Sequence, residues 1–238
     1  MAIARIASAH VAQTGPSGGG ALTEANATAI DTTGADFLVY ARASWASVAA
    51  ITPIDNKSNT LNALTSYDNA DSRFLLYYSS PAPTVGSGHK LYTSGAGAYP
   101  GVAWAAYSGV KQTSPFDAQV GNNTNTSGTT LQASSALTPA EDGELLYMAG
   151  VAGALGADDS FDVGSLLDRV DGTGGDPAYG LIHQDEIQTT ATSRQPTHTT
   201  GSAFQWRSMS VAAFKAAATS TSWGRGLSDE WCRIARTA

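Results

Sequence analysis

The sequence predicts an all-β protein: a two-sheet, jelly-roll-like β-sandwich built from two duplicated units, with a short helix near the C-terminal end. Three observations predict this fold. Short apolar runs alternate with turns rich in Gly, Pro, Ser and Thr, one stretch of sequence recurs at a nearly constant offset, and a helix-length amphipathic run occurs only near the end. Two separate small sandwiches are the alternative arrangement of the same strands.

The internal repeat is the strongest of these observations. Asp36–Ala41 aligns with Glu144–Ala149 at an offset of 108 positions, and Ala105–Ser108 aligns with Ala212–Lys215 at an offset of 107. One copy could not bury its apolar face alone, so we expect the two copies to pair into one body.

The repeat divides the 238 residues into three parts. They are an N-terminal segment ending in a Gly-rich linker (residues 1–29), the duplicated sandwich (30–217, with units 30–110 and 139–217) and a C-terminal segment (218–238). Residues 121–128, nearly all Asn, Thr, Ser and Gly, are predicted to form a linker or long loop between the units. A chain of this length can bury enough surface to be stable without disulfides or metal.

The apolar runs of the first unit predict six strands, each bounded by turn residues. They are Ala35–Ala43, Ser47–Ile54, Thr60–Tyr67, Arg73–Ser79, His89–Thr93 and Gly101–Val110. The polar run Asp55–Asn59 is predicted to form a hairpin loop, because Asn and Asp tolerate left-handed backbone angles. The second unit predicts four strands: Gly143–Val151, Ser160–Val170, Ala178–Ile187 and Gln205–Ala217.

The predicted helix spans Leu227–Ala235. Ser228 fits the N-cap position, and two acidic residues follow it in the first turn, where they favour the helix dipole. Leu227, Trp231 and Ile234 would form one apolar stripe.

Composition and charge exclude several classes of function. The net charge of −7 argues against a nucleic-acid binder, because the basic residues are too few to neutralise phosphates. The single cysteine, Cys232, excludes an internal disulfide and a cysteine-based zinc site. No apolar run of signal-peptide length follows Met1–Arg5, and no stretch approaches the roughly 20 apolar residues of a membrane span. We therefore expect a protein that is made in the cytoplasm and is not inserted into a membrane.

No motif predicts catalysis, a metal site or another cofactor. His89 and His198 occupy matching places in the two units, which suggests either a shared ligand role or half-exposed strand positions inherited through duplication. No second histidine lies at ligand spacing from either, which argues against zinc. Two clusters of carboxylates could bind calcium or simply cap turns: Asp68 with Asp71, and Asp158 and Asp159 with Asp162.

Five aromatic residues lie at or near predicted loops, Trp45 and the four binding candidates: Tyr67, Tyr92, Tyr99 and Trp223. A ring on a loop can stack on the apolar face of a sugar, so these four are the predicted glycan-binding positions. Packing beneath the loops is the alternative.

The terminal segments carry large apolar residues outside the predicted units: Ile3, Ile6, Leu227, Trp231 and Ile234. Burying such a side chain is worth roughly 1.5–3 kcal/mol, so these residues must pack on their own sandwich or on a partner. Because chain ends are ordered only when something holds them, we predict that at least one end binds a symmetric copy or a larger assembly.

A set of strand and turn motifs resembles a known group of proteins. In chain order the motifs are Thr33–Val39, Asp55–Thr60, Gly88–Leu91, Tyr99–Val110, Ser114–Asp117 and Glu141–Leu146. With them the chain resembles the β-sandwich proteins of tailed-phage and prophage structural regions, which serve as head decorations, head fibres or tail-associated receptor binders. Gly224–Glu230 is similar to the closing segment of concanavalin-like lectin domains in phage structural proteins.

The resemblance implies a non-enzymatic component of a virion, displayed as an oligomer. The expected partners are other virion proteins, further copies of the chain and, as a candidate, a host surface glycan; neither nucleic acid nor a membrane is expected. Synthesis in the host cytoplasm fits particles that assemble there and leave by lysis. The resemblance transfers no functional residue. A free-standing carbohydrate-binding protein or glycan hydrolase is the alternative function.

Overall fold

The computed structural model describes residues 2–12, 19–20, 22–45, 51–70, 72–94, 97–98, 100–152, 159–170 and 180–218. These residues form an all-β protein, as the sequence predicts, with five antiparallel sheets and one turn of 3-10 helix at Glu24–Asn26. The strands are β1 (Ala4–Ala12), β2 (Gly19–Gly20), β3 (Phe37–Trp45), β4 (Thr52–Asp55), β5 (Asn62–Ala63), β6 (Ser72–Ser79), β7 (Leu91–Ser94), β8 (Gly97–Ala98), β9 (Gly101–Ser108), β10 (Phe116–Thr124), β11 (Gly128–Gln132), β12 (Leu145–Ala152), β13 (Ser160–Phe161), β14 (Ser165–Val170), β15 (Gly180–Ile187), β16 (Thr197–Phe204) and β17 (Arg207–Phe214). In this part of the chain no helix is long and apolar enough to cross a membrane.

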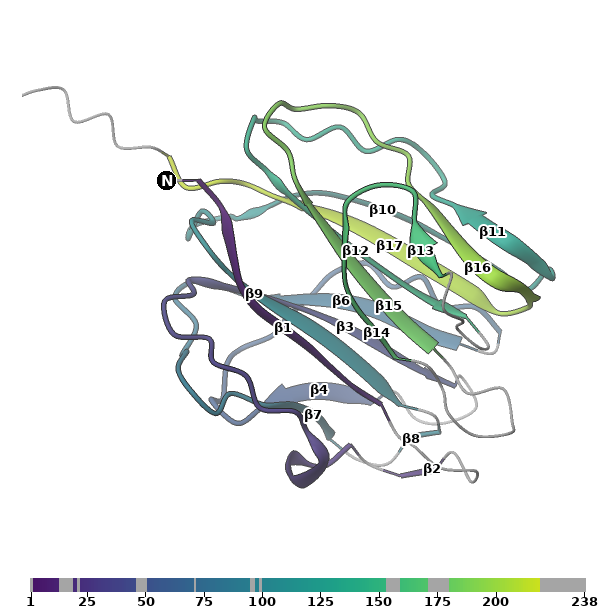
Figure 1. The fold of residues 1–238 in the computed structure, drawn as a ribbon, viewed down its shortest axis with the longest axis horizontal. Helices are drawn as coiled ribbons and strands as arrows, with labels where there is room; N and C mark the ends of the chain where they lie inside the picture. Colours follow the sequence, from purple (N-terminus) through teal and green to yellow (C-terminus); the bar gives the residue numbers. More distant parts are fainter. Residues whose placement is uncertain are drawn as a thin grey trace, which may run out of the picture.

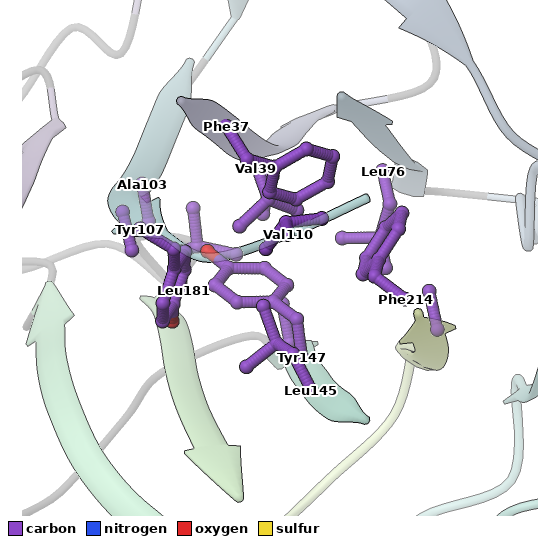
Figure 2. Close-up of a cluster of buried hydrophobic side chains, with 14 of the residues drawn as sticks. Phe37, Val39, Leu76, Ala103, Tyr107, Val110, Leu145, Tyr147, Leu181 and Phe214 are labelled. Carbon is purple, nitrogen blue, oxygen red and sulfur yellow. The ribbon is translucent and has the colours of Figure 1, made fainter. Parts of the chain in front are cut away.

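Two five-stranded sheets pack face to face at the centre of the molecule (Figure 1). The first has the strand order β1-β9-β3-β6-β5, and the second has the order β10-β17-β12-β15-β14. Phe37 and Leu76 of the first sheet share one buried cluster with Leu145, Tyr147 and Phe214 of the second. Figure 2 shows these side chains converging from both sheets on the space between them.

Smaller sheets cover the outer faces of the two large ones. The β11-β16-β13 sheet packs on the second large sheet, where Phe161 joins Met148 in another buried cluster. The β4-β7 pair packs on the first, where Leu91 joins Trp104 in a third cluster. The described chain therefore has four layers rather than the two that the sequence predicts.

The central strands are buried on both faces, and this explains the composition. Every residue of β12 and β17 is buried, as are the first seven residues of β9. Strands that are covered on both sides read as continuous apolar and small-residue runs instead of alternating patterns. A charged fraction of 14%, against about 25% in ordinary soluble domains, follows from this arrangement.

The two large sheets have the same strand order and register. In each sheet the first strand along the chain lies at one edge, followed across the sheet by the fifth, the second, the fourth and the third. Thus β1 corresponds to β10, β9 to β17, β3 to β12, β6 to β15 and β5 to β14. Phe37 pairs with Tyr107 in the first sheet, and Leu145 pairs with Phe214 in the second, 108 and 107 positions further along the chain. Residues at the same place in strand order and register are called equivalent below.

A β-bulge lies at the same point of the first strand in both sheets. The register of β1 shifts directly after Arg5, and the register of β10 shifts directly after Phe116. Arg5 is therefore equivalent to Phe116, and Ile6 in the first bulge is equivalent to Asp117 in the second. A bulge is a specific local feature, so its recurrence at one position adds to the correspondence of the two sheets.

The two large sheets face each other with their strand orders reversed. β3 packs on β12, β6 on β17, β9 on β15 and β1 on β14. This is the arrangement of an isologous twofold pair, in which each patch meets its own equivalent. The β9–β15 and β6–β17 contacts are counterparts across an approximate twofold axis through the β3–β12 contact, whereas the β1–β14 contact has no counterpart of similar extent between β5 and β10 in the described residues.

The structure corrects the predicted boundaries of the sandwich. β1 lies in the first large sheet, although residues 1–29 are predicted to lie outside it, and Ile3 is 5% exposed in the central core. β10 includes residues 121–124 of the predicted linker. Its polar composition hides it, because Asp117, Gln119 and two asparagines interrupt the apolar pattern on which strand prediction depends.

The loop at Asp55–Asn59 forms a turn but no hairpin. β4 pairs with β7, and the Asp55 carboxylate closes the turn by accepting hydrogen bonds from the backbone N–H groups of Lys57 and Asn59, both at 3.0 Å. The strands β11 and β16 lie where the sequence predicts no strand. The predicted helix at Leu227–Ala235 lies outside the described residues.

Candidate functional site

The twofold arrangement creates two equivalent corners between the large sheets, and their chemistry differs. The aromatic corner is made of Phe37, Tyr78, Phe116 and Phe214. Phe37 and Phe214 have ring centroids 4.7 Å apart, Tyr78 and Phe214 5.6 Å apart, and Tyr78 and Phe116 6.5 Å apart. Ring packing closes this corner and holds the two sheets together.

The ionic corner is the equivalent set: Leu145, Asp185, Arg5 and Tyr107. The Tyr107 hydroxyl donates to Asp185 Oδ2 at 2.8 Å, and Arg5 Nη1 lies 3.2 Å from Asp185 Oδ1. Asp185 holds the place of Tyr78, and Arg5 that of Phe116. A hydrogen bond and an ion pair thus replace two aromatic contacts.

The Asp185 carboxylate is almost enclosed, with 8% of its side chain exposed. Burial raises the pKa of Asp185, because a low-dielectric site disfavours the charged form, while the Tyr107 hydroxyl and the Arg5 guanidinium act in the opposite direction. Burial, followed by the nearby Asp185 charge, also raises the pKa of Tyr107 well above its ordinary value. Tyr107 therefore remains a hydrogen-bond donor at neutral pH.

A second polar pair lies behind the ionic corner. The Tyr147 hydroxyl is 3.0 Å from His183 Nδ1, on the neighbouring strands β12 and β15. His183 is fully buried, and its pKa falls to about 3, first because burial disfavours the imidazolium and then because His10 and Arg5 add positive charge nearby. His183 is neutral at pH 7, and among the described residues its Nε2 has no hydrogen-bond partner.

A cleft of about 450 Å³ opens at the ionic corner. Its lining consists of Arg5, Gly164, Ser165, Asp185, Glu186 and Ile187. Glu186 is already paired with Arg194 at 2.9 Å. The volume lies within the roughly 300–1,000 Å³ that is usual for small-molecule sites.

Exposed apolar residues lie in this cleft or next in sequence to its lining. Within the described ranges the exposed large hydrophobic residues are Ile6, Leu166 and Ile187, at 40%, 46% and 38%. Ile187 lines the cleft, and the other two adjoin lining residues in sequence. At the aromatic corner the positions equivalent to Ile6 and Ile187 are polar, Asp117 and Ser80. The aromatic corner has rings inside and polar residues at its rim. The ionic corner has polar groups inside and apolar residues at its rim.

Another buried cluster has the order hydroxyl, imidazole, carboxylate but is closed to substrate. Thr32 Oγ1 lies 2.9 Å from His89 Nδ1, and His89 Nε2 lies 3.1 Å from Asp55 Oδ2, an ion-pair distance without hydrogen-bond alignment. Thr32 and His89 have no exposed surface. Burial would raise the pKa of Asp55, but the close His89 imidazole and the hydrogen bonds from Asn59 outweigh it and lower that pKa to about 2. The cluster joins the outer layer to the first large sheet.

The two histidines that the repeat aligns are not equivalent. His89 forms a bridge with Ile30, and the matching bridge in the second half joins Arg194 to Leu137. Both histidines are fully buried instead of half-exposed. His198 stacks on Phe161 at 5.2 Å, and its pKa falls to about 3, first through burial and then through the Arg207 charge. A shared ligand role is therefore wrong.

A third cluster lies where the two halves of the chain join. Glu144 has no exposed surface, and its pKa rises to about 7, first through burial and then through the charge of Asp117. Asp117 is paired with Lys215 at 3.0 Å. The Glu141 backbone N–H donates to Glu144 Oε1 at 3.0 Å, and within the described chain Glu144 Oε2 accepts no hydrogen bond.

The predicted glycan-binding residues do not come together in the described part of the chain. Tyr67 is half-buried against the central core and Tyr92 against the outer cluster of the first sheet. A Cβ placed on Gly121 would lie 2.6 Å from the Tyr67 ring, so this ring fills space that a glycine leaves. Tyr99 and Trp223 lie outside the described residues.

The predicted assembly residues divide in the same way. Ile3 is core and Ile6 is exposed at the rim of the ionic corner, whereas Leu227, Trp231 and Ile234 lie outside the described residues.

The carboxylates predicted to bind calcium or cap turns bond to the chain where they are described. Asp68 accepts from the Phe74 N–H at 2.8 Å, Asp162 from the Thr197 N–H at 2.9 Å and Asp159 from the Gly201 N–H at 2.6 Å. Asp71 and Asp158 lie outside the described residues. Across the described ranges no group of three or more His, Cys, Asp or Glu side chains could hold a metal ion.

Sequence reasoning missed Arg5, Tyr107 and Asp185. The sequence does contain a signal for them: extending the repeat to the first strands aligns the charged Arg5 with the aromatic Phe116.

No protein-family model, curated protein or solved structure matches the chain.

Proposed function

We propose that the protein is a non-enzymatic structural component of a bacteriophage-like virion, placed as a head decoration, a head fibre or a tail-associated protein. The observation that carries the proposal is the pair of large sheets buried on both faces, a body built for rigidity. The motifs that resemble phage structural proteins, from Thr33–Val39 to Glu141–Leu146, supply the context.

We further infer that the chain arose by duplication of one unit, with the two copies packed as a fused pair. The shared strand order, the shared register and the bulges after Arg5 and Phe116 support this inference. The unit would then begin at β1 and recur at β10. The jelly-roll form of the sandwich and the C-terminal helix stay predictions.

The rigid body suits a particle that must survive outside the cell. Its central core is continuous across both halves, so unfolding one half exposes apolar surface of the other. The exposed rim of the ionic corner leaves a surface through which the body could contact another virion protein or a second copy.

Particle composition tests the proposal. Particles from a strain that carries the gene are purified on a density gradient and analysed by quantitative mass spectrometry. We expect the protein to co-sediment at a copy number comparable with capsid or tail proteins, while abundant cytoplasmic proteins of the host stay behind. Recovery only in the soluble fraction would contradict a virion role and favour the alternative, a free-standing carbohydrate-binding protein or glycan hydrolase.

A further inference from the structure

We propose that the cleft at the ionic corner binds a neutral saccharide, held by Arg5, Asp185 and Ser165 and packed against Ile187. This inference deepens the proposed function, because a virion component with such a site could contact a host glycan. The site differs from the loop tyrosines that the sequence suggests, and it lies between β1, β14 and β15.

The fold itself does not require charges at this corner. At the equivalent corner Phe116 and Tyr78 fill the same places with rings and close the same interface. The nearby carboxylate at that corner, Asp117, pairs with Lys215 and does not replace either ring. The Arg5–Asp185 pair is therefore an addition that the architecture tolerates but does not need.

Keeping a carboxylate at this position is unfavourable for stability. Transfer of a charged group out of water costs several kcal/mol unless partners offset it, and replacing such a pair by apolar residues is often neutral or stabilising. Asp185 nevertheless lies at the wall of an open cleft with its oxygens directed to Tyr107 and Arg5. A perturbed carboxyl in a cleft is a typical mark of a binding or catalytic site.

The charges of the cleft select the class of ligand. Arg5 and Asp185 cancel, and Glu186 is neutralised by Arg194 at 2.9 Å, so the lining carries no net charge. An ion would meet an opposing charge wherever it bound. A ligand that both donates and accepts hydrogen bonds without a charge fits better, and adjacent sugar hydroxyls have this property.

The geometry also provides the two kinds of contact that a sugar ring needs. The Asp185 carboxylate accepts, and the Arg5 guanidinium, with 41% of its side chain exposed, has further N–H groups to donate. Ile187 offers an apolar wall, 38% exposed, for the C–H face of the ring. Arg5 and Asp185 hold each other in place, so little side-chain order is lost on binding.

The test measures binding to the full chain by ligand-observed NMR. The probes are the methyl glycosides of glucose, galactose, mannose and N-acetylglucosamine at millimolar concentration, with methyl glucuronide and inorganic phosphate as anionic probes. We expect at least one neutral glycoside to bind the unmodified protein. Asp185→Asn should weaken that binding by about tenfold or more, because a charged acceptor is lost.

Two further variants keep the result interpretable. Ser165→Phe places a ring in the cleft from an exposed position and should abolish binding while leaving the protein folded. Asp117→Asn breaks the Lys215 ion pair away from the cleft and should leave affinity within about twofold.

Failure of every neutral glycoside to bind, binding of the anions alone, or unchanged affinity in Ser165→Phe would overturn the inference. Because the assay uses isolated protein, such a failure leaves the virion role to be decided by particle composition.

Discussion

The aromatic and ionic corners occupy equivalent positions but solve different problems. Four rings close the first, whereas Arg5, Asp185 and Tyr107 line the second beside a cleft. Because strand order and register are the same, the difference comes from side chains alone. The comparison teaches that two sheets of the same strand order and register can carry different chemistry at equivalent places, rings at one corner and an ion pair beside a cleft at the other.

The largest expected effect is at the aromatic corner. Phe214→Ala removes a fully buried ring that packs on Phe37 at 4.7 Å, and we expect it to lower the free energy of unfolding by about 3–5 kcal/mol in urea denaturation. At the equivalent position Tyr107→Phe keeps the ring and loses one hydrogen bond, so it should cost only about 1–2 kcal/mol. Equal losses would mean that the ionic corner is also a stability device.

The next effect depends on pH and compares Asp36 with its equivalent, Glu144. Asp36 accepts hydrogen bonds from the Gly109 and Val110 backbone N–H groups, at 2.8 and 3.3 Å, while burial raises the pKa of Glu144 to about 7 from 4.5. The Glu144 carboxyl thus holds its proton more tightly in the folded state than in the unfolded state. The contribution of Glu144 is complete below pH 4.5 and is lost as pH rises towards 7.

Glu144→Gln removes the loss of stability that comes from ionising Glu144 above pH 4.5. We expect the variant to be more stable than the unmodified protein by about 2 kcal/mol at pH 8 and by less than about 1 kcal/mol at pH 5. Thermal and urea unfolding across this range measure the difference. Asp36→Asn is the matched control and should destabilise by about 1 kcal/mol, because an amide has one acceptor oxygen in place of two. A gain that is independent of pH would contradict the raised pKa.

A smaller effect is expected when the ionic corner is rebuilt as an aromatic one. The double variant Arg5→Phe with Asp185→Tyr copies Phe116 and Tyr78, so it should fold and keep or raise its stability by up to about 2 kcal/mol. Asp185→Tyr alone leaves Arg5 without its partner and should be less stable than the pair. A double variant that fails to fold would show that the corners are not interchangeable.

The smallest effect concerns the rims. Ile187→Ser copies Ser80 at an exposed position and should alter the free energy of unfolding by less than about 0.5 kcal/mol. Ser80→Ile makes the reverse change but also removes the hydrogen bond that the Ser80 hydroxyl donates to the Gln112 backbone carbonyl at 3.0 Å, so it should cost about 1 kcal/mol. Saccharide binding should fall only in Ile187→Ser, as measured by the NMR titration. Equal binding in both variants would remove Ile187 from the site.

The sequence predicts the inner strands well, because burial leaves a direct mark on them. The apolar runs at Arg73–Ser79, Gly101–Val110 and Gly143–Val151 contain or match β6, β9 and β12. The repeat offsets of 108 and 107 agree with the observed register of the central strands. The strand order and the number of layers could not be predicted from the sequence, because both depend on which apolar runs pair across long stretches of chain.

The candidate site was not predictable for a related reason. Arg5 and Asp185 are 180 positions apart, and neither belongs to a motif. Their juxtaposition follows from the reversed packing of the two large sheets, which the sequence does not record locally. The alignment of the two histidines gave a wrong prediction of equivalence. His89 and His198 are the same residue type at similar offsets, but their positions in the strand register differ.

Because the first and last strands of each large sheet are neighbours, neither half can close until its final strand has been synthesised. Ala4 pairs with Ser108, and at about 5–20 residues per second the ribosome needs several seconds to deliver β9 to β1. Pairings of such long sequence separation also fold slowly, on the order of milliseconds to seconds. While β9 is still unpaired, β10 is the nearest strand that could pair with it in place of β1, because β10 follows β9 directly and is equivalent to β1. Correct translation-coupled folding then depends on β1 reaching β9 before β10 does.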